Sequence, residues 1–189
     1  MTNTRNLNER VLVIDPTNRG FGYVVFEGPQ RLIDWGLAHS RKTTVPRCLA
    51  RIAGMLRTYQ PTTLVIEDCT SRHSRRGKRA VVLLGSAVRL ASSLRLRITL
   101  LTWPVVKTTL ASARTVAKHH LAMMIASRFE ELAERLPPKR KPWMSEDERY
   151  GIFDAAAMGL AYFAGVGTRY RKPNSNSSRG KSAEIMEGR

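Results

Sequence analysis

Two short apolar runs, each ending in an acid, constrain this chain more than any other feature. Val11-Leu12-Val13-Ile14 leads directly into Asp15, and Thr63-Leu64-Val65-Ile66 leads into Glu67. An unbroken β-branched run of this length is typical of a strand buried on both faces of a sheet. If the two strands are parallel neighbours, both carboxylates lie at the carboxyl edge of the sheet, where open α/β sheets place their sites.

The remaining pattern predicts a mixed α/β sheet with helices on both faces. Three strands open the chain as an antiparallel meander, and the later strands arrive through helical crossovers, which favour parallel pairing. A capping-box pattern at Ser145–Glu148 predicts the start of the last helix. The expected strands are 11–14, 22–26, 31–37, 63–66 and 97–101, and the expected helices are 48–59, 80–94, 115–136 and 145–164.

Charge indicates the kind of partner. The 189 residues carry 32 Lys and Arg against 15 Asp and Glu, a net charge of +17. This excess favours a polyanion, nucleic acid first and an anionic membrane surface second. We expect an N-terminal arm over 1–10, one domain over 11–166 and a basic disordered tail over 167–189.

Several classes of protein do not fit. The polar start has no signal core, and no run approaches about 20 apolar residues, so we expect no membrane-spanning segment. With nucleic acid as the favoured partner, we expect no membrane partner. Cys48 and Cys69 have no metal-ligand spacing, and they fit a reducing, cytoplasmic compartment.

A third acid is available in the last predicted helix. Asp154 lies in the small, apolar stretch 151–157, where a charge is costly unless it is paired or binds metal. Asp147, Gly151 and Asp154 would share one helix face. Carboxylates facing each other closely are unfavourable without a cation between them, and Mg²⁺ suits such oxygen ligands.

These residues resemble the motifs of RuvC-type Holliday-junction resolvases. The stretch from Val11 to Phe26, with Asp15-Pro16 and Gly22-Tyr23, resembles the first motif, and Leu64-Val65-Ile66-Glu67 resembles the second. The segments 78–93, 104–107, 115–118 and 154–161 are similar to later motifs in the same order. The resemblance implies an RNase H-like fold with a five-stranded mixed sheet, a homodimer, and cleavage of branched DNA with a divalent metal.

The sequence departs from the family pattern at one metal position. The family's last helix carries two metal-binding residues three apart, whereas here Gly151 and Ala157 flank Asp154 at that spacing. Either Asp154 acts alone, or Asp147 supplies the missing ligand. Glu148 is a weaker candidate.

The resulting hypothesis is a structure-selective endodeoxyribonuclease that resolves four-way junctions with two Mg²⁺ ions, which Mn²⁺ could replace. Asp15 would bridge both ions, with Glu67 on one and Asp154 on the other. Lys118, or less favourably Lys107, would stabilise the transition state. The expected DNA contacts are Arg72, Arg75, Arg76, Lys78, Arg79 and Lys107.

Three alternatives stay open. The chain could be a non-catalytic DNA-binding protein of the same fold, as the Gly151 departure favours. It could be a nuclease for flaps, R-loops or ribosomal RNA precursors. A sugar-kinase-like ATPase begins with a similar strand–Asp–turn–strand, but this chain is short for two lobes and lacks a glycine-rich adenosine loop.

Overall fold

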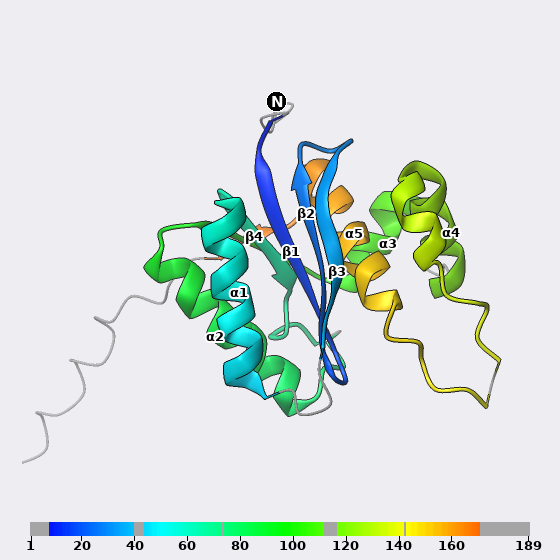
Figure 1. Cartoon of the computed structure of the whole chain (residues 1–189), viewed down its shortest axis with the longest axis horizontal. Coiled ribbons are helices and arrows are strands. Elements are labelled where there is room, and N and C mark those ends of the chain that lie inside the picture. Colours follow the sequence, from blue (N-terminus) through cyan, green and yellow to red (C-terminus); the bar gives the residue numbers. More distant parts are fainter. Residues whose placement is uncertain (1–7, 40–43, 73, 112–116, 142, 171–189) are drawn as a thin grey trace, which may run out of the picture.

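The protein was analysed as a computed structural model, which describes residues 8–39, 44–72, 74–111, 117–141 and 143–170. A mixed sheet forms the centre of the molecule (Figure 1). Its strand order is β3-β2-β1-β4-β5-β6. Its strands are β1 (Arg10–Thr17), β2 (Gly20–Glu27), β3 (Leu32–His39), β4 (Thr63–Glu67), β5 (Arg97–Leu101) and β6 (Thr168–Arg169).

Strand directions follow the expectation. Strands β1, β2 and β3 pair antiparallel, while β4 pairs in parallel with both β1 and β5. The expected count of five strands is wrong, because β6 adds a sixth, antiparallel to β5. Gly165 and Gly167 both have positive φ angles, and this turn directs the chain back along β5. Strand β6 lies in the segment that the sequence assigned to the tail.

Helices cover both faces of the sheet, as predicted (Figure 1). One face carries α1 (Val45–Tyr59) and α2 (Lys78–Ser93). The other face carries α5 (Tyr150–Phe163), which contacts β1 and β2, with α3 (Trp103–Ala111) and α4 (Lys118–Arg128) packed against it. None of the helices in the described ranges has the length and apolar character needed to cross a membrane.

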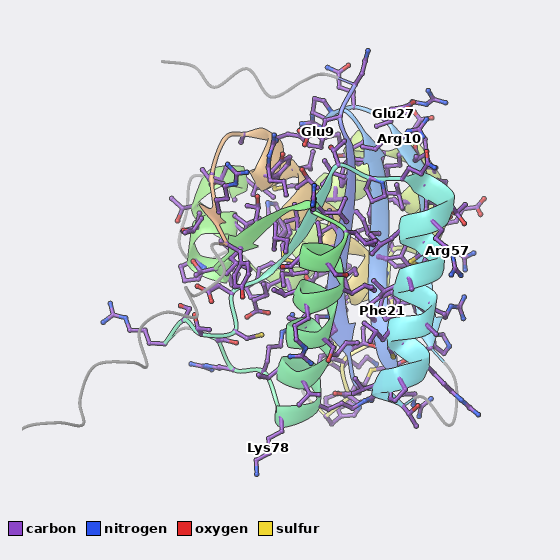
Figure 2. The ribbon with its side chains drawn as sticks, turned by 90° about the vertical axis from the view of Figure 1, so that its left-hand side faces the viewer. Glu9, Arg10, Phe21, Glu27, Arg57 and Lys78 are labelled. Atoms are coloured by element: carbon purple, nitrogen blue, oxygen red, sulfur yellow. The ribbon has the colours of Figure 1, made fainter. Side chains whose placement is uncertain are left out.

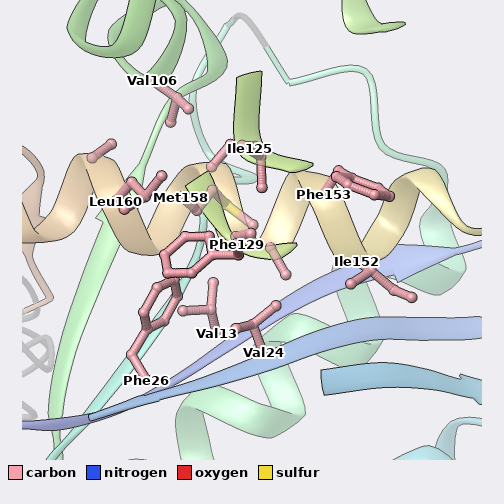
Figure 3. Packing of buried hydrophobic residues seen from close by; sticks show 14 of the residues in the cluster. Val13, Val24, Phe26, Val106, Ile125, Phe129, Ile152, Phe153, Met158 and Leu160 are labelled. Carbon is pink, nitrogen blue, oxygen red and sulfur yellow. The ribbon is translucent and has the colours of Figure 1, made fainter. Parts of the chain in front are cut away.

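Alternating side chains of β1 supply two hydrophobic cores. Val11 and Val13 point to the α5 side. There they belong to a hydrophobic cluster that also contains Phe26, Phe129 and Met158 (Figure 3). The intervening residues of β1 point to the α1 and α2 side. Burial on both faces explains why the strand is an unbroken apolar run rather than an alternating one.

The segment between β5 and α5 differs most from the sequence prediction. Helix α3 was not expected, and the helix predicted over 115–136 is α4 followed by the 3₁₀ helix η1 (Glu130–Arg135). Helix α5 begins at Tyr150, so the capping-box prediction at Ser145–Glu148 is wrong. The acids of that segment pair with basic side chains, and Asp147 also accepts from the backbone N–H of Arg149, which immediately precedes α5.

Glycines let α5 approach the sheet closely. A Cβ atom on Gly22 of β2 would lie only 2.2 Å from the carbonyl carbon of Gly151 in α5. The two backbones are therefore in contact at this point. Every residue from Tyr150 to Tyr162 is buried, because α5 lies between the sheet and α3 and α4.

Candidate active site

Two acids stand side by side where β1 and β4 end. The parallel register pairs Ile14 with Ile66, so the next residues, Asp15 and Glu67, are neighbours at the carboxyl edge. Both side chains are almost completely buried, with 2% and 3% of their residue surface exposed. The sequence predicted this juxtaposition, and the strand register confirms it.

The contact between Gly22 and Gly151 brings the third acid, Asp154, to the same edge of the sheet. Asp15 pairs with Gly22 across the β1–β2 ladder, and Gly22 touches Gly151. Asp154 lies one helical turn after Gly151, which brings its side chain to the end of β1. Asp154 is also buried, and its negative charge acts on Asp15. Three carboxylates that are far apart in the chain thus share one buried site.

Arg76 connects two of these acids. Its Nε donates to Oε2 of Glu67 at 2.5 Å, and its second terminal nitrogen donates to Oδ1 of Asp15. The remaining terminal nitrogen donates to the carbonyl oxygen of Pro16 at 2.7 Å. Burial opposes the charge of Arg76, but Asp15 and Glu67 outweigh it and raise the pKa of Arg76 above its usual range. A single guanidinium therefore neutralises part of the acidic site.

Lys118, at the start of α4, forms an ion pair with the third acid, Asp154. Its Nζ lies 2.6 Å from Oδ2 of Asp154 and also donates to Oε1 of Glu146. Although burial opposes the charged form, these two acids raise the pKa of Lys118. The sequence placed Lys118 in the site as a cation near the reacting phosphate, and the structure does bring it to the site.

Burial dominates the protonation of Asp15 and Asp154. Desolvation raises the pKa of Asp15 well above its ordinary value, and the charge of Asp154 raises it further, against Arg76 and Lys118. Desolvation also raises the pKa of Asp154, with Lys118 as the main opposing influence. More positive charge at this site would therefore favour the ionised carboxylates.

The donor set fits a hard divalent cation in its chemistry. The three carboxylates offer only oxygen atoms, which Mg²⁺ prefers. Thr17 Oγ1, beside them, has no hydrogen-bond partner although it is buried. As the side chains stand, no three His, Cys, Asp or Glu residues within the described ranges form a group that could hold a metal ion. Arg76 and Lys118 supply positive charge there instead.

Thr17 closes Gly151, one of the positions where the family pattern would place a fourth metal ligand. A Cβ atom on Gly151 would lie 2.7 Å from Cγ2 of Thr17, so a side chain there requires Thr17 to move. Asp147, the substitute considered from the sequence, is not in α5 and is bound by Arg149, whose hydrogen bonds lower the pKa of Asp147. It nevertheless lines a small cavity of about 180 Å³ together with Asp15.

Glu146 and Glu148 lie in the same loop as Asp147, before α5. Glu148 lies 3.7 Å from Arg19, whereas Glu146 faces Lys118 and lines both this cavity and a larger pocket beside it. Sequence reasoning misses Glu146, because the pattern of this segment predicts the start of a helix. The structure makes it the loop acid nearest to the site's lysine.

The larger pocket, open and about 790 Å³ in volume, leads to the acids. Arg75 and Lys107 line it, and Trp103 contributes its indole, whose Nε1 donates to Oε2 of Glu67 at 3.2 Å. The sequence pattern does not predict this bond between Trp103 and Glu67. The pocket therefore combines acids, basic side chains and one aromatic ring.

The other predicted DNA contacts surround the same edge. Arg72, Arg75 and Lys78 are exposed, and Lys78 lies at the lower end of α2 in Figure 2. Arg79 donates to the carbonyl oxygen of Asn18. Arg76 differs from these residues, because its side chain is only 21% exposed and faces the acids.

Sheet order, strand directions and helix placement define an RNase H-like α/β fold. No protein-family model and no curated protein matches this chain. Among solved structures, Thermus thermophilus RuvC matches with a TM-score of 0.62 and 21% identity, over 85% of this chain and 99% of that one. T. thermophilus RuvC in complex with a Holliday junction substrate matches with the same TM-score and identity, over 86% and 99%.

The yeast mitochondrial Holliday junction resolvase Ydc2 matches with a TM-score of 0.49 and 13% identity, over 83% of this chain and 78% of that one. The likeness to the two Thermus structures confirms, at the level of the fold, the resemblance to RuvC-type resolvases. This chain has the RuvC fold over most of its length.

Proposed function

We propose that this protein is a structure-selective endodeoxyribonuclease that resolves four-way DNA junctions with divalent metal ions. One observation carries the proposal: Asp15, Glu67 and Asp154 come together, buried, at the carboxyl edge of a RuvC-fold sheet. Burying three acids in one place costs stability unless cations balance them. Arg76 and Lys118 balance part of this charge, and the remainder can attract a metal ion.

Each side chain has a role in this proposal. Asp15, Glu67 and Asp154 would hold two Mg²⁺ ions, or Mn²⁺ in their place. When bound, the metal supplies an activated water and stabilises the departing oxygen. Lys118 lines the larger pocket next to Asp154. From there its ammonium group can donate to a non-bridging oxygen of the DNA phosphate. Trp103 orients Glu67 through the indole N–H.

Basic residues around the pocket would hold the DNA. Arg75 and Lys107 line the entrance, with Arg72 and Lys78 exposed beside it. Contacts of this kind fix the phosphate backbone and the direction of the duplex arms without reading sequence. One Thermus RuvC structure holds a Holliday junction substrate, which supports a branched DNA partner for this fold.

A homodimer is part of the proposal, because a four-way junction has approximate two-fold symmetry. Val81 and Val82 on α2 are exposed, with 43% and 54% of their surface accessible. Neighbouring exposed valines on one helix are suited to contact a second copy. Two active sites related by a two-fold axis could then cut two strands of one junction.

The test is a cleavage panel with purified protein. Four-way, flap, R-loop and linear DNA are incubated with and without Mg²⁺, and the products are mapped on sequencing gels. We expect paired, symmetric nicks in the four-way junction alone. Asp154→Asn should remove cleavage while junction binding is retained, because Asp154 is buried and is not one of the exposed basic residues proposed to hold the DNA. Cutting of flaps or R-loops in preference to junctions would change the proposed substrate.

A second candidate function is structure-specific DNA binding without cleavage. The closed position at Gly151 and the pairing of the acids with Arg76 and Lys118 favour it. The same panel separates the two functions. Tight junction binding with no product at any Mg²⁺ or Mn²⁺ concentration would support the non-catalytic protein.

A further inference from the structure

We propose that Arg76 is an internal counter-ion that competes with the divalent cation for Asp15 and Glu67, and that a DNA phosphate draws it away. The inference rests on the proposed nuclease function and adds a regulation of that same site. It assigns Arg76 a role different from that of the exposed basic residues beside it.

The geometry of Arg76 is that of a bridging cation. Three nitrogens of one guanidinium bind Glu67, Asp15 and the carbonyl oxygen of Pro16, and the carboxylate of Asp154 also acts on it electrostatically. An oxygen atom that accepts from Arg76 has a lone pair occupied and faces a positive charge. A cation seeking the same oxygens must displace these hydrogen bonds.

Charge balance strengthens the competition. Asp15, Glu67 and Asp154 carry three negative charges when ionised, and Arg76 and Lys118 return two positive charges. The remaining charge attracts a divalent ion less than three unpaired carboxylates would. Arg76 thus stabilises the protein without metal and lowers the affinity for metal.

The chain around Arg76 allows the side chain to leave. Residues 74–77 have no helical or strand structure, and Arg75 and Gly77 on either side are exposed. Arg76 borders the open pocket, so a phosphate held by Arg75 or Lys107 would arrive within reach of it. A phosphate offers guanidinium the same two-oxygen geometry that a carboxylate does. DNA binding would therefore free the acids for metal.

The experiment measures Mg²⁺ binding by titration calorimetry on DNA-free protein, without any cleavage. Arg76→Gln should bind Mg²⁺ about tenfold more tightly or better, the factor that corresponds to losing one charge-assisted hydrogen bond from the acids. Arg76→Lys should lie between this variant and the wild type. Arg75→Gln removes the same charge from the neighbouring, exposed residue and should change the affinity less than Arg76→Gln.

Thermal unfolding gives a second readout. Without metal, Arg76→Gln should melt at a lower temperature than the wild type, because Asp15 and Glu67 lose their counter-ion. Adding Mg²⁺ should raise its melting temperature by more than that of the wild type. A short linear duplex should tighten Mg²⁺ binding to the wild type and leave Arg76→Gln almost unchanged.

Unchanged or weaker Mg²⁺ binding by Arg76→Gln would refute the proposed competition between Arg76 and Mg²⁺ for Asp15 and Glu67. A wild type whose Mg²⁺ affinity does not respond to DNA would overturn the release by phosphate. These outcomes are independent of cleavage. A protein that shows the predicted Mg²⁺ effects but cuts no junction keeps the counter-ion role of Arg76 and loses the proposed nuclease function.

Discussion

The packing of Gly151 against β1 can be tested by a double-mutant cycle. The perturbation is Gly151→Ala, which adds a Cβ atom 2.7 Å from Cγ2 of Thr17, while its other close neighbours, atoms of Gly22, lie at 3.3 Å or more. Thr17→Ser removes that methyl group and keeps the hydroxyl. If the methyl contact is the cause of strain, the two substitutions compensate each other.

The magnitudes follow from this geometry. An extra methyl group in a tight core costs about 1–3 kcal/mol, and a better helix former at position 151 returns at most about 1 kcal/mol. Gly151→Ala alone is therefore neutral to destabilising by about 3 kcal/mol. In the Thr17→Ser background, the overpacking cost disappears. We expect a coupling free energy of about 1–3 kcal/mol between the two sites.

The assay is urea unfolding of the wild type, both single variants and the double variant. Gly54→Ala in α1 is the matched control, because a Cβ atom at Gly54 would have no neighbour within 4 Å outside its own helix turn. It should stabilise the protein by up to about 1 kcal/mol in either background. A coupling free energy within error of zero would show that Thr17 does not close the position.

Three further predictions concern DNA binding, catalysis and stability. Lys78→Gln should lower the slope of log affinity for duplex DNA against log salt by about 0.9, measured by fluorescence anisotropy, if Lys78 neutralises one phosphate. Trp103→Phe should slow junction cleavage about two- to tenfold at unchanged junction affinity, since it removes one hydrogen bond to Glu67; an unchanged rate would contradict that role. A hydrogen bond to Asp34 raises the pKa of Tyr59 to about 12. An unfolded tyrosine titrates near about 10, so this stabilisation is complete below about pH 10 and is lost as the pH rises towards 12. Melting curves of Tyr59→Phe should therefore show a smaller loss of stability over that range than the wild type, and an equal loss would refute the assignment.

Local pattern was sufficient to predict the main acids. Asp15 and Glu67 each end a buried apolar run, and parallel pairing makes such positions neighbours. Asp154 was identified because a charge in a small, apolar helix needs a partner. All three inferences depend on the residues that flank each acid in the sequence. The two strand-end acids also need the rule that parallel strands place their carboxyl ends at the same edge of a sheet.

The rest depends on contacts between distant segments. Arg76 belongs to a run of basic residues, and nothing in that run distinguishes the one side chain that turns inward. The closing of position 151 depends on Thr17 and Gly22, which are more than a hundred residues away. The sequence places Asp147 in the last helix, because its segment has the pattern of a helix cap. In the structure this segment precedes α5, and its acids pair with Arg149 and Lys118.

The proposed function requires Asp15, Glu67 and Asp154 to act as one metal-binding centre. Anomalous diffraction from crystals saturated with Mn²⁺ gives the sharpest test, since the signal locates the ion whether or not the protein is active. We expect density bonded to Asp15 and to at least one of the other two acids, with the guanidinium of Arg76 displaced. Crystals at saturating Mn²⁺ that show no ion there, and Arg76 still bridging Asp15 and Glu67, would refute the shared centre.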